Sequence, residues 1–243
     1  MTKTAKAALN STMISQRARP EILAMGGYVS ARSIEKSTTG TIFLDANECA
    51  FEPFVGAHNL SRYPEQQPVA LQDAICRWLD VSSRHITITR GADEAIECLV
   101  RAFCVPGRDN IVICPPTFAM YAQSATLQNA EVREARLDNE FDLDVKLIKQ
   151  TTDKNTKIIF VCSPNNPTAN LMTRARIVQL CADYADTALI VVDETYVEFA
   201  DSESVIPCLD AHANLVVLRT LSKTHAAPYR LADHQHGFPG NLP

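Results

Sequence analysis

The chain has 243 residues, 46% of them hydrophobic, which is enough to bury a sizeable core in one large domain or two small ones. A formal net charge of −5 gives no electrostatic reason to expect nucleic acid or an anionic membrane as a partner. The apolar runs, such as residues 158–162, are of strand length and far short of the roughly 20 residues that span a bilayer, so no transmembrane segment is expected.

The cysteines and the basic N-terminus carry little functional information. Eight cysteines are scattered without a Cys-x-x-Cys pair or matching His spacing, and most fall inside apolar patterns. We therefore expect small core residues in a reducing compartment, with neither disulfides nor a metal site. The first twenty residues lack acids, as transit peptides do, but a polar arm on a cytoplasmic protein is the favoured interpretation.

The expected elements fall into two parts in chain order. Residues 1–81 hold one strand, about 41–44, and one helix, about 69–79, and predict an N-terminal arm together with part of a small-domain or dimer-contact segment. From Thr87 onward, short apolar runs alternate with helical periodicity. Strands are expected at 86–88, 111–114, around 132, 157–162, 188–192 and 214–218, and helices at 96–103, 118–127, around 145–148 and 177–184. This alternation indicates an α/β fold: a three-layer, mostly parallel, doubly wound sheet over residues 82–223.

Two turns follow expected strands. In Arg90-Gly91-Ala92-Asp93-Glu94, the amides of Ala92 and Asp93 lie at the positive end of a helix dipole and suit a phosphate, although an ordinary capped helix start explains the same residues. In Ser163-Pro164-Asn165-Asn166-Pro167-Thr168, the prolines can hold an Asn amide outward as a donor, although the segment is also common turn vocabulary.

Two charged residues end apolar strands. Asp193 ends the run Val191-Val192, where a buried carboxylate is costly unless a cation meets it. That cation is either a protein arginine or a ligand such as a pyridinium nitrogen, with Tyr196 near a ring oxygen. Lys223 follows another strand beside Thr220 and Ser222, where a desolvated amine can form a Schiff base and the hydroxyls can hold a phosphate. A solvated loop lysine is the alternative.

These four pieces occupy the carboxyl ends of separate strands, which a doubly wound sheet brings to one crevice. A single ligand with a phosphate, a ring oxygen, a basic ring nitrogen and an aldehyde satisfies all of them. That ligand is pyridoxal 5′-phosphate (PLP).

The chain resembles the fold-type I pyridoxal-phosphate aminotransferases, and within them the histidinol-phosphate aminotransferases, from about Pro20 to Lys223. The general signature is Ser163-Pro164-Asn165-Asn166-Pro167-Thr168, Asp193-Glu194-Thr195-Tyr196 and Ser222-Lys223. The narrower likeness lies in Leu44-Asp45-Ala46-Asn47-Glu48, Arg62-Tyr63-Pro64-Glu65-Gln66-Gln67-Pro68, Arg90 to Glu94, Arg101-Ala102-Phe103-Cys104, Cys114 to Tyr121 and Leu218 to Lys223.

The resemblance implies a role for each site residue. Lys223 would hold the cofactor and move the substrate proton, and Asp193 would keep the ring nitrogen protonated. The remaining cofactor contacts would come from Asn166 and Tyr196 to the ring oxygen, Phe118 to the ring face, and Ala92, Asp93, Thr220 and Ser222 to the phosphate. Tyr63 would reach the neighbouring subunit's cofactor, which implies a homodimer. Tyr28 and Asn47 would contact substrate.

The departures from the family pattern concern the C-terminal end. After Lys223 the family continues with a Gly-rich turn, an arginine and a small domain that binds substrate, whereas residues 224–243 here are rich in His, Pro and Gly. We expect an irregular tail, a reading-frame shift near Ala226 and a missing small domain. Ala169 replaces a family glycine and would be strained at positive φ.

The activity implied by the resemblance is PLP-dependent amino transfer between histidinol phosphate with 2-oxoglutarate and imidazole-acetol phosphate with glutamate, in histidine biosynthesis. Two alternatives remain open. One is a non-catalytic remnant that binds PLP weakly, because the closing domain is absent. The other is a different enzyme for phosphorylated substrates, such as a threonine-phosphate decarboxylase. Neither nucleic acid, membrane nor metal is an expected partner.

Overall fold

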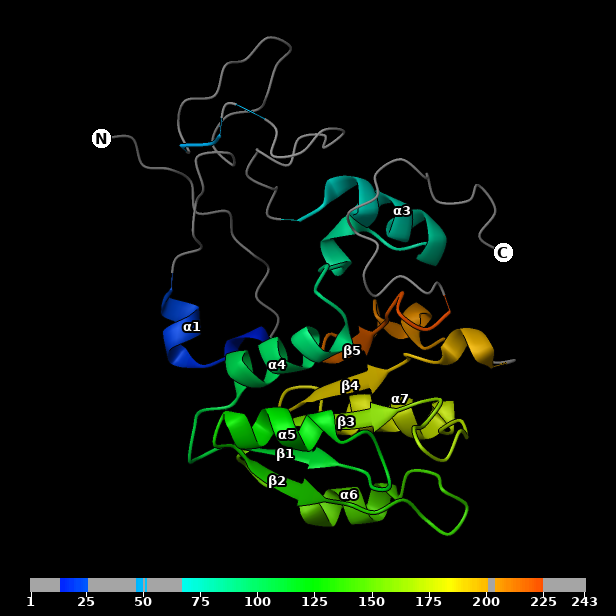
Figure 1. Ribbon diagram of the computed structural model, residues 1–243. Coiled ribbons are helices and arrows are strands. Elements are labelled where there is room, and N and C mark those ends of the chain that lie inside the picture. Colours follow the sequence, from blue (N-terminus) through cyan, green and yellow to red (C-terminus); the bar gives the residue numbers. More distant parts are fainter. Residues whose placement is uncertain (1–13, 26–46, 50, 52–66, 201–203, 225–243) are drawn as a thin grey trace. The chain divides into compact units, whose positions relative to one another are not determined.

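Five parallel strands form one sheet in the computed structural model, which describes residues 14–25, 47–49, 51, 67–200 and 204–224 (Figure 1). The strand order is β2-β1-β3-β4-β5. The strands are β1 Asn110–Ile113, β2 Glu131–Glu134, β3 Thr156–Cys162, β4 Leu189–Asp193 and β5 Leu215–Leu218. All neighbouring pairs are parallel, as the alternation of strand and helix in the sequence predicts.

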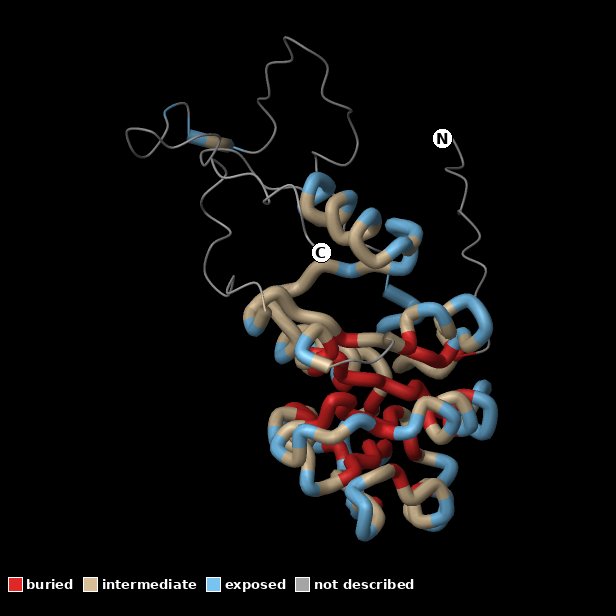
Figure 2. Tube along the Cα trace, turned by 90° about the vertical axis from the view of Figure 1, so that its right-hand side faces the viewer, coloured by how far each residue is buried: buried red, intermediate tan, exposed pale blue. Residues whose placement is uncertain are grey.

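The interior strands are apolar on both sides because helices cover both faces of the sheet. All residues of β1 and β4 are buried, whereas the edge strand β2 has three charged residues among its four and none that is buried. Helices α4 (Ala92–Phe103) and α5 (Met120–Leu127) share one hydrophobic cluster with Ile111, Phe160 and Val191. Helices α6 (Val145–Thr151) and α7 (Arg174–Asp183) share the other with Val112 and Val192. Figure 2 shows the buried residues gathered along the sheet between these layers.

The described residues divide into two compact units, of which the sheet and residues 14–24 form one. Ile14 is 4% exposed and belongs to the cluster under α4. The N–H of Arg19, between the short helices η1 (Ser15–Arg17) and α1 (Pro20–Ala24), donates to Ala102 O at 2.8 Å, and its guanidinium donates to Arg101 O at 3.0 Å. These contacts satisfy carbonyls that the C-terminal turn of α4 leaves open. Part of the predicted arm therefore packs on the sheet unit.

The second unit contains α3 (Val69–Leu79) and the short helix η2 (Ser83–His85). The strand predicted at 86–88 is wrong. Gln67 instead exchanges two hydrogen bonds with the backbone of Ile88, and the side-chain amide of Gln72 donates to Ile86 O. A strand requires a neighbouring backbone, and within the described chain side-chain amides take that place. The boundary predicted at residue 82 stays a prediction, as does the strand at 41–44, which lies outside the described residues.

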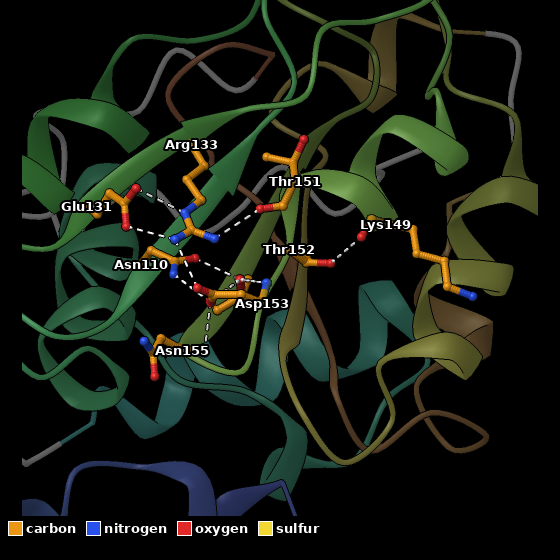
Figure 3. Close-up of polar contacts among 9 residues, drawn as sticks. Asn110, Glu131, Arg133, Lys149, Thr151, Thr152, Asp153 and Asn155 are labelled. Carbon is orange, nitrogen blue, oxygen red and sulfur yellow. Dashed lines mark hydrogen bonds and ion pairs between the residues drawn. The ribbon is translucent and has the colours of Figure 1, made fainter.

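Polar residues at the amino ends of the strands bind one another. Figure 3 shows Arg133 between Glu131 and Asp153, with its guanidinium also donating to Thr151 O at 3.2 Å. The Arg133–Glu131 and Arg133–Asp153 ion pairs measure 3.0 and 2.9 Å, and the fully buried Asn110 amide donates to Asp153 at 2.9 Å. Each of these charged side chains is paired with another side chain of the same edge, so the contacts serve the fold.

None of the eight cysteines forms a disulfide, and four of them are buried. Of the helices in the described ranges, none is both long and apolar enough to cross a membrane, and no group of His, Cys, Asp or Glu side chains there could hold a metal ion.

Candidate active site

The carboxyl ends of three strands lie side by side. Cys162 at the end of β3 pairs in register with Asp193, and Asp193 pairs with Leu218 at the end of β5. The arrowheads of all five strands point the same way in Figure 1. Helix α4 leads through residues 104–109 into β1, so it runs against the strands and begins at this same edge. Parallel α/β sheets bind ligands at this edge, and the predicted motifs of the sheet unit follow its strands.

Asp193 is unusual at this edge because it is a carboxylate residue and is only 2% exposed. Its Oδ1 accepts from the Thr195 N–H at 3.0 Å and from Thr195 Oγ1 at 2.6 Å, and its Oδ2 accepts from Tyr121 Oη at 2.7 Å. All three donors are neutral, and within the described residues no arginine, lysine or histidine pairs with Asp193. Of the two cations that the sequence left open, a protein arginine is therefore not observed.

Tyr121 connects Asp193 to the core. Its ring stacks on Phe160 with centroids 4.6 Å apart and planes 7° apart, and Phe118 packs edge-on against it at 5.6 Å. Burial, followed by the negative charge of Asp193, raises the pKa of Tyr121 above its ordinary value, so the hydroxyl remains a donor. The same two causes raise the pKa of Cys162 to about 11. The groups next to Asp193 are therefore aromatic rings and the protonated side chains of Tyr121 and Cys162, and none of them carries a charge. A ligand with one positive charge would suit this position.

Glu194 is as buried as Asp193 but lies in a different electrostatic environment. Its carboxylate pairs with Arg219 at 3.2 Å and accepts from Ser204 Oγ at 2.6 Å and the Val205 N–H at 2.7 Å. Successive residues of a strand face opposite sides of a sheet. Within the part of the chain that the structure describes, Glu194 thus has a cationic partner and Asp193 has none.

The two asparagines of the Pro-Asn-Asn-Pro turn have separate functions. Asn165 is 3% exposed, and its side-chain amide donates to Pro116 O at 2.8 Å and Thr168 Oγ1 at 2.7 Å. It therefore ties the loop after β3 to the loop after β1. No hydrogen bond among the described residues uses the side chain of half-buried Asn166, the residue predicted to donate to a ligand.

The predicted phosphate contacts come from two segments. Gly91, with φ of 91°, precedes α4, and no described side chain caps this helix. The Glu94 carboxylate accepts a hydrogen bond from the Arg90 N–H, and this bond is the main reason that the pKa of Glu94 is lowered. Because this carboxylate binds the Arg90 N–H, no described side chain accepts from the amides of Ala92 and Asp93. In the other segment, the hydroxyls of Thr220 and Ser222 lie 2.8 Å apart.

Lys223 and Tyr196 lie together after neighbouring strands. The Lys223 Nζ is 5.8 Å from the centroid of the Tyr196 ring. Tyr196 is half-buried, whereas Lys223 is exposed, so the desolvated amine predicted from the sequence is not observed. The position of Lys223 after a strand was predictable from the sequence. How far its side chain is buried depends on which segments pack around it.

Three predicted residues are not placed at this edge. Tyr28 and Tyr63 lie outside the described residues. Asn47 is exposed, has φ of 51° and belongs to the second unit. Conversely, the sequence interpretation assigned no role to Tyr121, Asn165 or Arg219. The available signals were a tyrosine in an apolar helical pattern, a paired Asn and an arginine directly after a strand.

A family model described as aminotransferase class I and II matches residues 44–232. The chain belongs to the class I and II aminotransferases. Within this family it is 45% identical over 214 residues to the histidinol-phosphate aminotransferase of Stenotrophomonas maltophilia, an alignment covering 86% of this chain and 58% of that protein. The corresponding protein of Pectobacterium carotovorum is 41% identical over 227 residues, covering 93% and 62%. The chain thus spans about three-fifths of the length of these curated aminotransferases.

Solved structures of an aminotransferase and of a decarboxylase have the same fold. The histidinol-phosphate aminotransferase of Clostridium acetobutylicum superposes with a TM-score of 0.62 at 24% identity, covering 70% of this chain and 50% of that one. An L-threonine-O-3-phosphate decarboxylase of Porphyromonas gingivalis superposes with a TM-score of 0.55 at 27% identity, covering 66% and 46%. The predicted α/β fold is confirmed, and the aminotransferase family that the sequence resembles is the family whose model matches the chain.

Proposed function

We propose that this chain binds pyridoxal 5′-phosphate at the strand edge and carries out the amino-transfer chemistry of its family. The observation that carries the proposal is Asp193, a carboxylate that is 2% exposed and contacts only neutral donors in the described structure. A basic ring nitrogen would supply the missing positive charge, and Asp193 would hold a proton on it. The bound cofactor would supply an aldehyde and an electron-withdrawing ring.

The other residues of the edge fit the remaining groups of this cofactor. Asn166 and Tyr196 would donate to the ring oxygen, and Phe118 would cover one ring face. The amides of Ala92 and Asp93, with the hydroxyls of Thr220 and Ser222, would hold the phosphate at the start of α4. Lys223 would bind the aldehyde and then take and return the proton at the substrate Cα.

The proposed substrates are histidinol phosphate and glutamate, with imidazole-acetol phosphate and 2-oxoglutarate as their counterparts. Support comes from the relatives of Stenotrophomonas maltophilia and Pectobacterium carotovorum, which are 45% and 41% identical and are both named histidinol-phosphate aminotransferase. Tyr28 and Asn47 would contact substrate, and Tyr63 would reach the site of a second copy in a homodimer. We propose the cytoplasm as the location of this small-molecule chemistry.

Cofactor capture tests the proposal directly. The purified chain is titrated with PLP, reduced with borohydride and digested, and the covalent adduct is located by mass spectrometry. We expect the adduct on Lys223 and its loss in Lys223→Ala, while Lys149→Ala, which removes an exposed lysine of α6, behaves as wild type. Adducts spread over several lysines would refute the assignment of Lys223.

The decarboxylase remains a second candidate because a solved enzyme of that activity is among the structural neighbours at 27% identity. Phosphothreonine and histidinol phosphate are offered separately to the PLP-loaded chain. Amino transfer gives an aminated cofactor and an oxo product, whereas decarboxylation releases carbon dioxide. A chain that captures PLP on Lys223 but converts neither substrate would be the non-catalytic remnant.

A further inference from the structure

A largely covered group of three charged side chains, of which one is fully buried, joins the loops after β4 and β5. Arg219, the first residue after β5, pairs with Glu194 at 3.2 Å and with Glu198 in the short helix η3 (Val197–Phe199). The exposed fractions of the three side chains are 16%, 3% and 17%. We call these three residues the Arg219 clamp.

Glu194 gives the clamp a fixed anchor. Its carboxylate accepts hydrogen bonds from Ser204 and from the Val205 N–H, and its own N–H donates to Leu218 O at 3.0 Å. The anchor is therefore held by backbone on both β5 and the segment after η3. Side-chain orientations that are fixed by several hydrogen bonds are well suited to positioning a reactive group.

The two clamped loops carry residues that the proposed chemistry uses. Tyr196 lies between Glu194 and Glu198, and Lys223 follows Arg219 after Thr220-Leu221-Ser222. The Lys223 Nζ lies 5.8 Å from the Tyr196 ring centroid although the two residues follow different strands. The arrangement of Lys223 relative to Tyr196 therefore depends on how the exit of β5 is held against the exit of β4.

We infer that Arg219 is a positioning residue that holds Lys223 for reaction with the cofactor aldehyde, an inference that rests on the proposed function. Stability alone explains the clamp poorly, because buried ion pairs are often no more stabilising than apolar residues of similar volume. The chain offers a comparison in Arg133, which also lies between two carboxylates but at the opposite edge of the sheet (Figure 3).

The test compares Arg219→Met with Arg133→Met, at a temperature where circular dichroism shows both to be folded. For Arg219→Met we expect PLP affinity to fall about tenfold and adduct formation on Lys223 to slow, as misplaced reactive groups do. Arg133→Met should behave as wild type, and Arg219→Lys should recover part of the loss. Equal affinity and equal adduct rates in the two methionine variants would overturn the inference.

A second readout needs no cofactor. Reductive methylation with formaldehyde measures the reactivity of each lysine by mass spectrometry, with Lys149 as an internal reference. Release from the Tyr196 ring should raise the Lys223 rate about threefold in Arg219→Met. An unchanged rate would overturn the inference whether or not PLP binds, whereas a raised rate with no PLP capture by wild type would refute the proposed function alone. If Arg219→Met fails to fold, Glu198→Gln, which keeps the Glu194 pair, replaces it with the same criteria.

Discussion

Replacing Asp193 by asparagine should stabilise the ligand-free chain while weakening its hold on PLP. The side chains are nearly isosteric, and Asn retains an oxygen that can accept from the N–H and hydroxyl of Thr195. The Asn amide can donate to the Tyr121 hydroxyl, reversing the bond that Tyr121 now makes. The substitution thus removes a charge and little else.

The expected sign comes from two opposing contributions. Burying a carboxylate without a cation costs several kcal/mol. Each hydrogen bond to a charged acceptor stabilises by only about 1 kcal/mol more than one to a neutral acceptor, and Asp193 accepts three. The cost is slightly the larger, so Asp193→Asn should raise the free energy of unfolding by about 1 kcal/mol, or the melting temperature by about 2–4 °C.

Urea unfolding of PLP-free protein measures the first effect, and PLP titration measures the second. Loss of a charged partner for the ring nitrogen should weaken PLP binding at least about tenfold. Glu194→Gln is the matched control because it neutralises the adjacent buried carboxylate, which does have a cation. It should destabilise by about 2 kcal/mol, less than a fully isolated pair because Arg219 keeps Glu198.

The two variants therefore separate a ligand-directed carboxylate from a structural one by sign. If Asp193→Asn destabilises the chain by more than about 1 kcal/mol and leaves PLP affinity unchanged, the carboxylate serves the fold. That outcome would remove the observation on which the cofactor proposal rests.

Two further predictions concern stability. Ala169 has φ of 60°, so Ala169→Gly should raise the free energy of unfolding by up to about 1 kcal/mol. Ala182→Gly, at an exposed position of helix α7, should lower the free energy of unfolding by about as much. Changes of the same sign in urea unfolding would contradict backbone strain at Ala169. The hydrogen bond from Asn110 is the main reason that the pKa of Asp153 lies below its ordinary 3.8. The stabilisation that ionised Asp153 contributes is therefore present at neutral pH and is lost as pH falls below about 4. Asp153→Asn should flatten that part of the profile of unfolding free energy against pH, and an unaltered slope would exclude the linkage.

Most of the sheet could be predicted because each strand is a short apolar run and each covering helix shows a single apolar face. The helix predicted at 69–79 and the strand predicted at 157–162 agree with α3 and β3 to within one residue. The failure at 86–88 has a physical origin. An apolar pair such as Ile86 and Ile88 can form a strand only beside a free backbone, and side-chain amides of Gln67 and Gln72 bind there instead.

The site was predictable as an ordered set of strand ends but not as a set of contacts. Periodicity placed Asp193 and Lys223 after their strands, and parallel topology placed them at one edge. Whether Asp193 has a protein cation depends on which arginine folds beside it, and one of its two side-chain donors, Tyr121, is 72 residues away in sequence. Such distant contacts leave no trace in local spacing, which is why two interpretations of Asp193 were open until the fold was described.

The adjacent carboxylates at the end of β4 explain how the fold tolerates a buried carboxylate that has no cationic partner among the described residues. Strand alternation sends Asp193 toward α5 and Glu194 away from it, so a single dipeptide serves two environments. On one side, the ion pair of Glu194 and Arg219 joins the loops after β4 and β5. This contact offsets part of the free-energy cost of burying Asp193. On the other side, Asp193 contacts only neutral donors among the described residues. A stability that depends on ligand binding is the expected consequence, because a cation that binds only the folded chain stabilises it by mass action.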